Sequence, residues 1–132
     1  MTEEPPIESS ASLRLAKGPL VGPALCRVVS IVLARAHCPM DQIDDAMLVC
    51  DALSAHAPDH TLDGQLSFAV SARGGRFELR VGALADASAK RLVAESVLPG
   101  VGNVLERMTD ELRIEPATAG GAGEELVLGM SF

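Results

Sequence analysis

The sequence contains no tryptophan and no tyrosine, and only three of its 132 residues are phenylalanine. An aromatic core is therefore excluded, and leucine, valine, isoleucine, alanine and methionine must fill the interior. Positive charge is also scarce, because 11 lysines and arginines stand against 18 aspartates and glutamates, for a formal net charge of -7. This balance argues against binding to nucleic-acid backbones or to anionic membrane surfaces, which both need basic groups. A basic protein partner suits the charge better.

The sequence also lacks the signals of export, membrane insertion and zinc binding. Its three cysteines, Cys26, Cys38 and Cys50, form no Cys-x-x-Cys pair and no cluster with histidine at zinc-site spacing. Their odd number and apolar surroundings predict reduced, buried thiols. The acidic start of the chain is unlike a secretory signal, and the apolar stretch at 20–36 is too short and too charged to span a membrane. We therefore expect a cytoplasmic protein.

The length of the chain and its 48% content of hydrophobic residues predict one folded domain. We expect a flexible tail at residues 1–11 and a single domain at residues 12–132. The clearest local signal is a β-hairpin with Gly74 and Gly75 in its turn, since paired glycines readily adopt positive φ. The expected elements are strands at 12–15, 65–72, 76–81, 111–115 and 125–132, and helices at 20–38, 41–58, 92–97 and 100–108.

The order of these elements predicts the fold class. Tight turns join successive strands, so the sheet is expected to be mixed and largely antiparallel, with the helices on one face. The result is an α/β two-layer sandwich. At the start of the second helix, Asp41 is the expected N-cap, and Asp44 and Asp45 favour the positive end of the helix dipole.

Residues 100–112 carry the best fragment of a known motif, in which Gly100 and Gly102 open an apolar helix and Asp110 leads into a strand. Together with the layout of the elements, this fragment resembles the anti-sigma-factor serine-kinase family. The resemblance covers residues 12–132. It implies the histidine-kinase-like ATP-binding fold that this family shares with DNA gyrase and a heat-shock chaperone. It also implies that Gly100 and Gly102 lie where the chain covers the phosphates, and that Gly123 is the glycine before the last strand.

Other positions of the family's motifs differ in this chain. The family has a glutamate that acts as base and, four residues later, an asparagine that holds Mg²⁺. Aligned on Asp51, the second position is Ala55, which cannot bind a metal, and alignment one residue earlier gives Cys50 and Ser54, which fit no better. The family's threonine after the glycine is Glu124 here, and its charge would repel a phosphate. The aspartate that reads adenine has no counterpart.

The resemblance thus implies an anti-sigma factor-like regulatory protein of a partner-switching transcription control system, which acts by protein binding with a degenerate ATP site. Its implied partners are a sigma factor, an anti-anti-sigma (STAS-type) protein and a second copy of the chain in a homodimer. We expect no bound cofactor, although the family binds ATP and Mg²⁺. Asp41, Asp44 and Asp45 are the candidate contacts for a basic partner.

Two alternatives stay open. The first is an active ATP-dependent serine/threonine kinase that phosphorylates an anti-anti-sigma factor, with Asp51 as the catalytic base. The second is an α/β regulatory domain unrelated to the family.

The candidate residues also have purely structural interpretations. Asp51 fits an ordinary polar helix face, and Gly100 and Gly102 fit a helix start that needs open backbone angles. The glycine-rich segment 120–123 fits a flexible connection. Four further residues could form a metal cluster, but a loop rich in turn-forming residues explains them equally well: His56, Asp59, His60 and Asp63.

Overall fold

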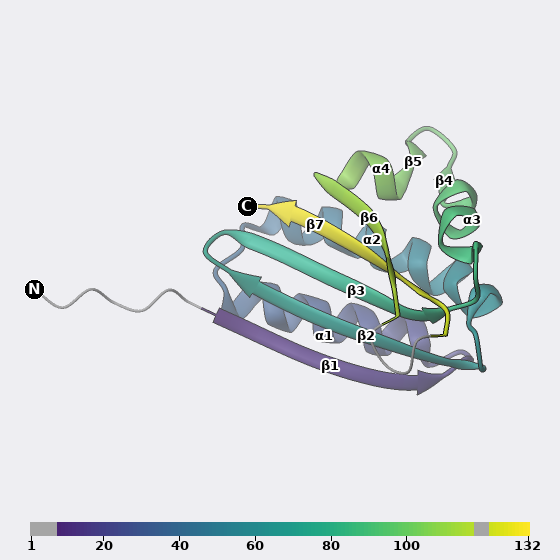
Figure 1. The fold of residues 1–132 in the computed structure, drawn as a ribbon. Coiled ribbons are helices and arrows are strands. Elements are labelled where there is room, and N and C mark those ends of the chain that lie inside the picture. Colours follow the sequence, from purple (N-terminus) through teal and green to yellow (C-terminus); the bar gives the residue numbers. More distant parts are fainter. Residues whose placement is uncertain (1–7, 118–121) are drawn as a thin grey trace, which may run out of the picture.

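The computed structural model describes residues 8–117 and 122–132, which form an α/β protein with a five-stranded antiparallel sheet packed against helices (Figure 1). The strand order is β1-β2-β3-β7-β6. The elements are β1 (Glu8–Ala16), α1 (Val21–Arg35), α2 (Met40–His56), η1 (Ala57–His60), β2 (Gln65–Arg73), β3 (Arg76–Leu84), α3 (Ser88–Glu95), β4 (Val97–Leu98), β5 (Gly102–Asn103), α4 (Val104–Met108), β6 (Glu111–Pro116) and β7 (Glu124–Ser131).

The sheet is antiparallel at every strand pair of the described chain, so the expected mixed pairing is not found. The reason lies in the connection between β1 and β2, which contains two helices. A single helix between two strands brings the chain back to the end of the sheet where the first strand began, so the second strand runs parallel to the first. Here a second helix, α2, carries the chain back to the opposite end of the sheet before β2 begins. The next strand therefore runs antiparallel.

One face of the sheet is buried and the other faces solvent. Along β2, Leu66, Phe68, Val70 and Ala72 are buried, and the residues between them are exposed. Figure 1 shows α1 and α2 lying across the buried face. The buried stripe of α1, which includes Leu25, recurs at helical spacing and packs into the same core cluster as the strands. Burial of this apolar surface is the main driving force for the fold.

The hairpin expected from the sequence is confirmed. β2 and β3 pair from Ser67 opposite Gly82 to Arg73 opposite Arg76. Gly74 and Gly75 lie in the turn with φ of 58° and 76°, which is the left-handed region that side chains disfavour. A Cβ at Gly75 would also lie 2.8 Å from the carbonyl oxygen of Phe132, so the turn is fixed by its contact with the end of the chain.

Two boundaries near the amino terminus differ from the expectation. β1 begins at Glu8 rather than at Ser12, because Glu8 pairs with Arg73 at the far end of the long strand β2. Residues 8–11, expected in the tail, therefore belong to the sheet. Asp41 is not the N-cap of α2. Pro39 takes that position and its carbonyl accepts the first backbone hydrogen bonds, which places Asp41 in the first turn.

The glycine pair at 100 and 102 also has a different setting. We expected a helix to open at Gly100, but residues 97–103 form a small hairpin of β4 and β5, in which Gly100 and Gly102 have φ of 83° and 88°. The helix α4 begins only at Val104, where the Asn103 side chain accepts a hydrogen bond from the backbone N–H of Glu106 at 3.1 Å. The glycines therefore serve a tight turn before a capped helix.

Candidate functional site

The amino-terminal end of α3 is the most informative part of the site. The first N–H groups of a helix have no partner within the helix and attract anions. Here the Glu124 carboxylate, from the start of β7, accepts hydrogen bonds from Ala87 N–H at 2.8 Å and from Ala89 N–H at 3.1 Å. A carboxylate of the chain itself therefore occupies the place where a phosphate could bind this helix end.

Gly123 positions that carboxylate. Its φ is 84°, and a Cβ there would lie 2.5 Å from the carbonyl oxygen of Leu84. The backbone at the start of β7 thus lies directly against the end of β3, where Leu84 pairs with Glu124. Only glycine allows this close approach. The part of the glycine-rich segment at 118–121 lies outside the described residues.

Asp51 is exposed on α2 and is turned toward α1. Its Oδ1 accepts a hydrogen bond from the Cys26 thiol at 3.6 Å. Gly100 and Gly102 belong to the β4–β5 hairpin, where the nearest side chain to a Cβ at Gly102 would be Arg107. No contact described in the structure joins Asp51 to these glycines.

The side of α2 that packs on α4 is apolar. Leu53 on α2 and Leu105 on α4 are both 0% exposed and belong to the same core cluster. Both helices therefore contribute hydrophobic side chains to the same core.

The acidic residues at the start of α2 form a charged face. Asp41 and Asp44 are exposed and Asp45 is half-buried, and none of them forms an ion pair with another described residue. Their spacing of three and four residues, continued by Asp51, places them on one side of the helix. The charge of this face is thus not neutralised by an ion pair within the described residues.

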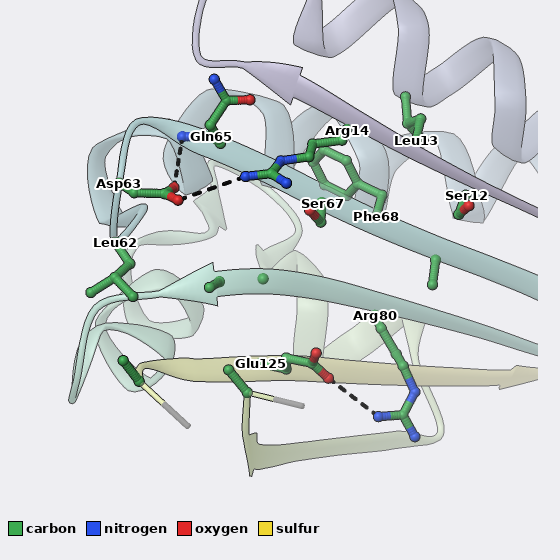
Figure 2. A pocket seen from close by; sticks show the side chains of 15 residues that line it. Ser12, Leu13, Arg14, Leu62, Asp63, Gln65, Ser67, Phe68, Arg80 and Glu125 are labelled. Atoms are coloured by element: carbon green, nitrogen blue, oxygen red, sulfur yellow. Dashed lines mark hydrogen bonds and ion pairs between the residues drawn. The ribbon is translucent and has the colours of Figure 1, made fainter. Parts of the chain in front are cut away.

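An open groove of about 520 Å³ crosses the solvent face of the sheet (Figure 2). Small residues of the inner strands, Ser67, Ala69 and Gly82, contribute to its lining. Two ion pairs line the groove. In the first pair, Arg14 lies 3.9 Å from Asp63, and in the second pair, Arg80 Nη1 lies 3.3 Å from Glu125 Oε2. This open groove with paired charges differs from the enclosed, largely apolar pockets that bind small ligands.

The solvent face continues into a ladder of arginines and glutamates on β3 and β6. Arg80 lies 2.8 Å from Glu115 and 3.1 Å from Glu78, and Arg113 lies 2.8 Å from Glu115 and also pairs with Glu111. Hydrogen bonds from Arg113 and Arg80 hold the pKa of Glu115 below its ordinary value. The pairing of Arg80 with Glu115, 35 residues apart in the sequence, left no local signal in the sequence.

The region of η1 contains a histidine–carboxylate contact instead of a metal cluster. His60 is 8% exposed, and its Nε2 lies 2.8 Å from Oε2 of Glu95, which also lies 3.9 Å from Nδ1 of His56. The hydrogen bond with His60 lowers the pKa of Glu95. Asp63 is engaged elsewhere, with Arg14 and the Gln65 N–H.

The metal interpretation of His56, Asp59, His60 and Asp63 is therefore not supported, since the described residues hold no group of three ligands suited to a metal ion. Glu95, for which the sequence carries no local signal, is the hydrogen-bond partner of His60 in this region.

None of the helices in the described ranges is long and apolar enough to cross a membrane. No family model matches the chain, and no curated protein matches it either.

Proposed function

We propose that this protein is an anti-sigma factor-like regulator of a partner-switching transcription control system, with a histidine-kinase-like fold and a degenerate nucleotide site, and that it acts by binding other proteins. The observation that carries the proposal is the position of Glu124. Its carboxylate satisfies Ala87 N–H and Ala89 N–H at the start of α3. A nucleotide phosphate could bind this helix end only by displacing the Glu124 carboxylate, which would then lose both hydrogen bonds.

The surroundings of Asp51 support the same proposal. Phosphoryl transfer depends on a metal that holds the phosphates in position. One turn along α2 from Asp51 is Ala55, whose methyl group offers no metal ligand, and Asp51 itself faces the Cys26 thiol. The residues that α2 and α4 contribute to the shared core are hydrophobic and offer no side-chain oxygen for Mg²⁺.

The surface of α2 supports binding of a basic partner. Asp41, Asp44 and Asp45 carry charge that no described arginine or lysine neutralises. Unpaired charge of one sign on a protein surface accelerates and orients association with a partner of the opposite sign. We therefore assign the sigma-factor contact to this face.

Calorimetric titration of the purified chain with ATP and with ADP, each with and without Mg²⁺, tests the nucleotide part of the proposal. We expect no binding at micromolar nucleotide. A parallel titration of Glu124→Thr, which replaces the carboxylate with the family's residue, asks whether this carboxylate alone blocks the helix end. Micromolar binding of ATP to the unaltered chain would contradict the proposal and favour the kinase alternative.

Binding measurements with the sigma factors and STAS-type proteins of the source organism test the partner part. The double variant Asp44→Lys/Asp45→Lys should weaken the complex at least about tenfold, because attraction is converted into repulsion. Asp86→Lys is the control, since Asp86 is an exposed aspartate in the turn between β3 and α3. Equal affinity of both variants would contradict the assigned face, and the absence of any complex would contradict the proposed function.

A further inference from the structure

Helices α1 and α2 meet along a seam of small residues. A Cβ at Gly22 of α1 would lie only 3.5 Å from Cβ of Ser54 of α2, so the two backbones approach closely there. The helices run antiparallel, so one turn forward on α1 faces one turn back on α2. That step leads from Gly22 to Cys26 and from Ser54 to Cys50. The seam therefore brings two cysteines into contact, 24 positions apart in the sequence.

The two thiols have different surroundings. Cys50 is 0% exposed, whereas Cys26 is half-buried and open to solvent on one side. A hydrogen bond from the Cys50 thiol lowers the pKa of Cys26, while the same contact and burial raise the pKa of Cys50. The Asp51 carboxylate, 3.6 Å from Cys26 Sγ, acts in the opposite direction on Cys26 because its charge opposes a second negative charge. Cys26 is thus the thiol that ionises and that a reagent can reach.

We propose that Cys26 and Cys50 form a reversible oxidation site for hydroperoxides, in which Cys26 is the attacking thiol and Cys50 is the resolving thiol of a disulfide between α1 and α2. The contact across the seam carries this inference, which does not depend on the proposed function.

The reaction balances with one hydroperoxide per disulfide. The Cys26 thiolate attacks one peroxide oxygen, an S–O bond forms, and the O–O bond breaks to release hydroxide, or an alkoxide from an alkyl hydroperoxide. Cys26 is then a sulfenic acid. Cys50 sulfur attacks Cys26 Sγ, an S–S bond forms, and the S–O bond breaks. The departing hydroxide takes the Cys50 proton and leaves as water. Two electrons pass from the two sulfurs to the peroxide.

Oxidation has a direct structural consequence at Asp51. A disulfide removes the Cys26 S–H and with it the hydrogen bond to Asp51 Oδ1, and it fixes α1 to α2 covalently. Such intracellular disulfides are typically transient and are reduced again by dithiols. The site would therefore change the α1–α2 surface only while oxidant is present.

Mass spectrometry of the full chain after treatment with hydrogen peroxide tests the inference. The reduced protein is oxidised, its remaining thiols are alkylated under denaturing conditions, and disulfide-linked peptides are identified. We expect one intramolecular disulfide that joins Cys26 to Cys50, reversed by dithiothreitol. Cys38→Ser is the matched control and should behave as the wild type, because Cys38 Sγ contacts the Pro39 carbonyl away from the seam.

Two further variants separate the roles of the thiols. Cys50→Ser should accumulate a sulfenic acid at Cys26 that a 1,3-dicarbonyl reagent traps, and Cys26→Ser should give no such adduct at Cys50. Asp51→Asn should move the pH profile of Cys26 oxidation to lower pH and raise its rate about threefold or more at neutral pH. Three results would each overturn the proposal: a disulfide that involves Cys38, a disulfide between two chains, or a Cys26 that oxidises to sulfinic acid while Cys50 stays free.

Discussion

The two hydrogen bonds that Glu124 accepts from Ala87 N–H and Ala89 N–H make it the cap of α3. Replacement of a capping side chain typically costs about 1–2 kcal/mol, and a charged cap also interacts with the helix dipole. We expect Glu124→Ala to lower the free energy of unfolding by this amount, and Glu124→Gln to have a smaller effect because one acceptor remains. Urea denaturation measures both. Glu106→Ala is the control, and an equal loss there would contradict the capping role.

Gly100 and Gly123 have nearly the same backbone conformation, with φ of 83° and 84°, but different surroundings. A Cβ at Gly100 would meet nothing within 4 Å, whereas one at Gly123 would lie 2.5 Å from the Leu84 carbonyl oxygen. We expect Gly100→Ala to cost about 1–2 kcal/mol from the left-handed backbone alone. Gly123→Ala should cost about 1–3 kcal/mol more because of the clash. Equal losses of stability in denaturation would show that the contact with Leu84 relaxes freely.

The arginine–glutamate ladder on β3 and β6 makes the sheet sensitive to acid. Hydrogen bonds from Arg113 and then Arg80 hold the pKa of Glu115 below its ordinary value of 4.5. Because its pKa is lower in the folded state, Glu115 contributes its full stabilisation above about pH 4.5, which is the pKa of a glutamate in the unfolded chain. This contribution is lost as the pH falls through the lower, folded pKa. We expect Glu115→Gln to flatten the decline of the unfolding free energy below pH 4.5.

Glu106→Gln provides the comparison for that measurement, since Glu106 is exposed on α4 and forms no ion pair with another described residue. Its acid decline should follow that of the wild type. If Glu115→Gln also follows the wild type, the ladder contributes nothing to the pH dependence.

The elements that sequence could predict are those specified by local chemistry. The β2–β3 hairpin follows from strict alternation around Gly74 and Gly75, and both strands and turn are confirmed. The start of β1 could not be predicted, since Glu8 joins the sheet only through its pairing with Arg73. The glycines at 100 and 102 suit a helix start and a tight turn equally well, and tertiary packing selected the turn.

The site is less accessible to sequence reasoning because its contacts connect distant positions. The sequence predicts that the charge of Glu124 repels a phosphate, but its role as a cap depends on the position of Ala89 in α3, 35 residues earlier in the chain. The same applies to His60 with Glu95 and to Cys26 with Cys50. Local patterns report which face a side chain occupies, and the partner on that face is set only by the assembled fold.

At the scale of the whole molecule, one core cluster joins α1, α2, α3 and α4 to the strands β2, β3 and β7, and partly buried residues of β1 and β6 pack against it. We therefore expect a single cooperative unfolding transition, with equal calorimetric and van't Hoff enthalpies. Because the chain has no tryptophan or tyrosine, far-ultraviolet circular dichroism replaces fluorescence as the second probe. Separate transitions in the two measurements would show that the helical layer and the sheet unfold independently.

The same core predicts which substitutions lower the free energy of unfolding most. Leu53, on α2, is 0% exposed at the centre of the helical layer, whereas Leu20, just before α1, is 71% exposed. We expect Leu53→Ala to lower the free energy of unfolding by about 2–5 kcal/mol because it leaves a cavity. Leu20→Ala should change it by less than about 0.5 kcal/mol. In a cooperative core the Leu53→Ala loss should appear equally in the helix signal and in the calorimetric midpoint, since the sheet cannot remain folded without the layer that covers it.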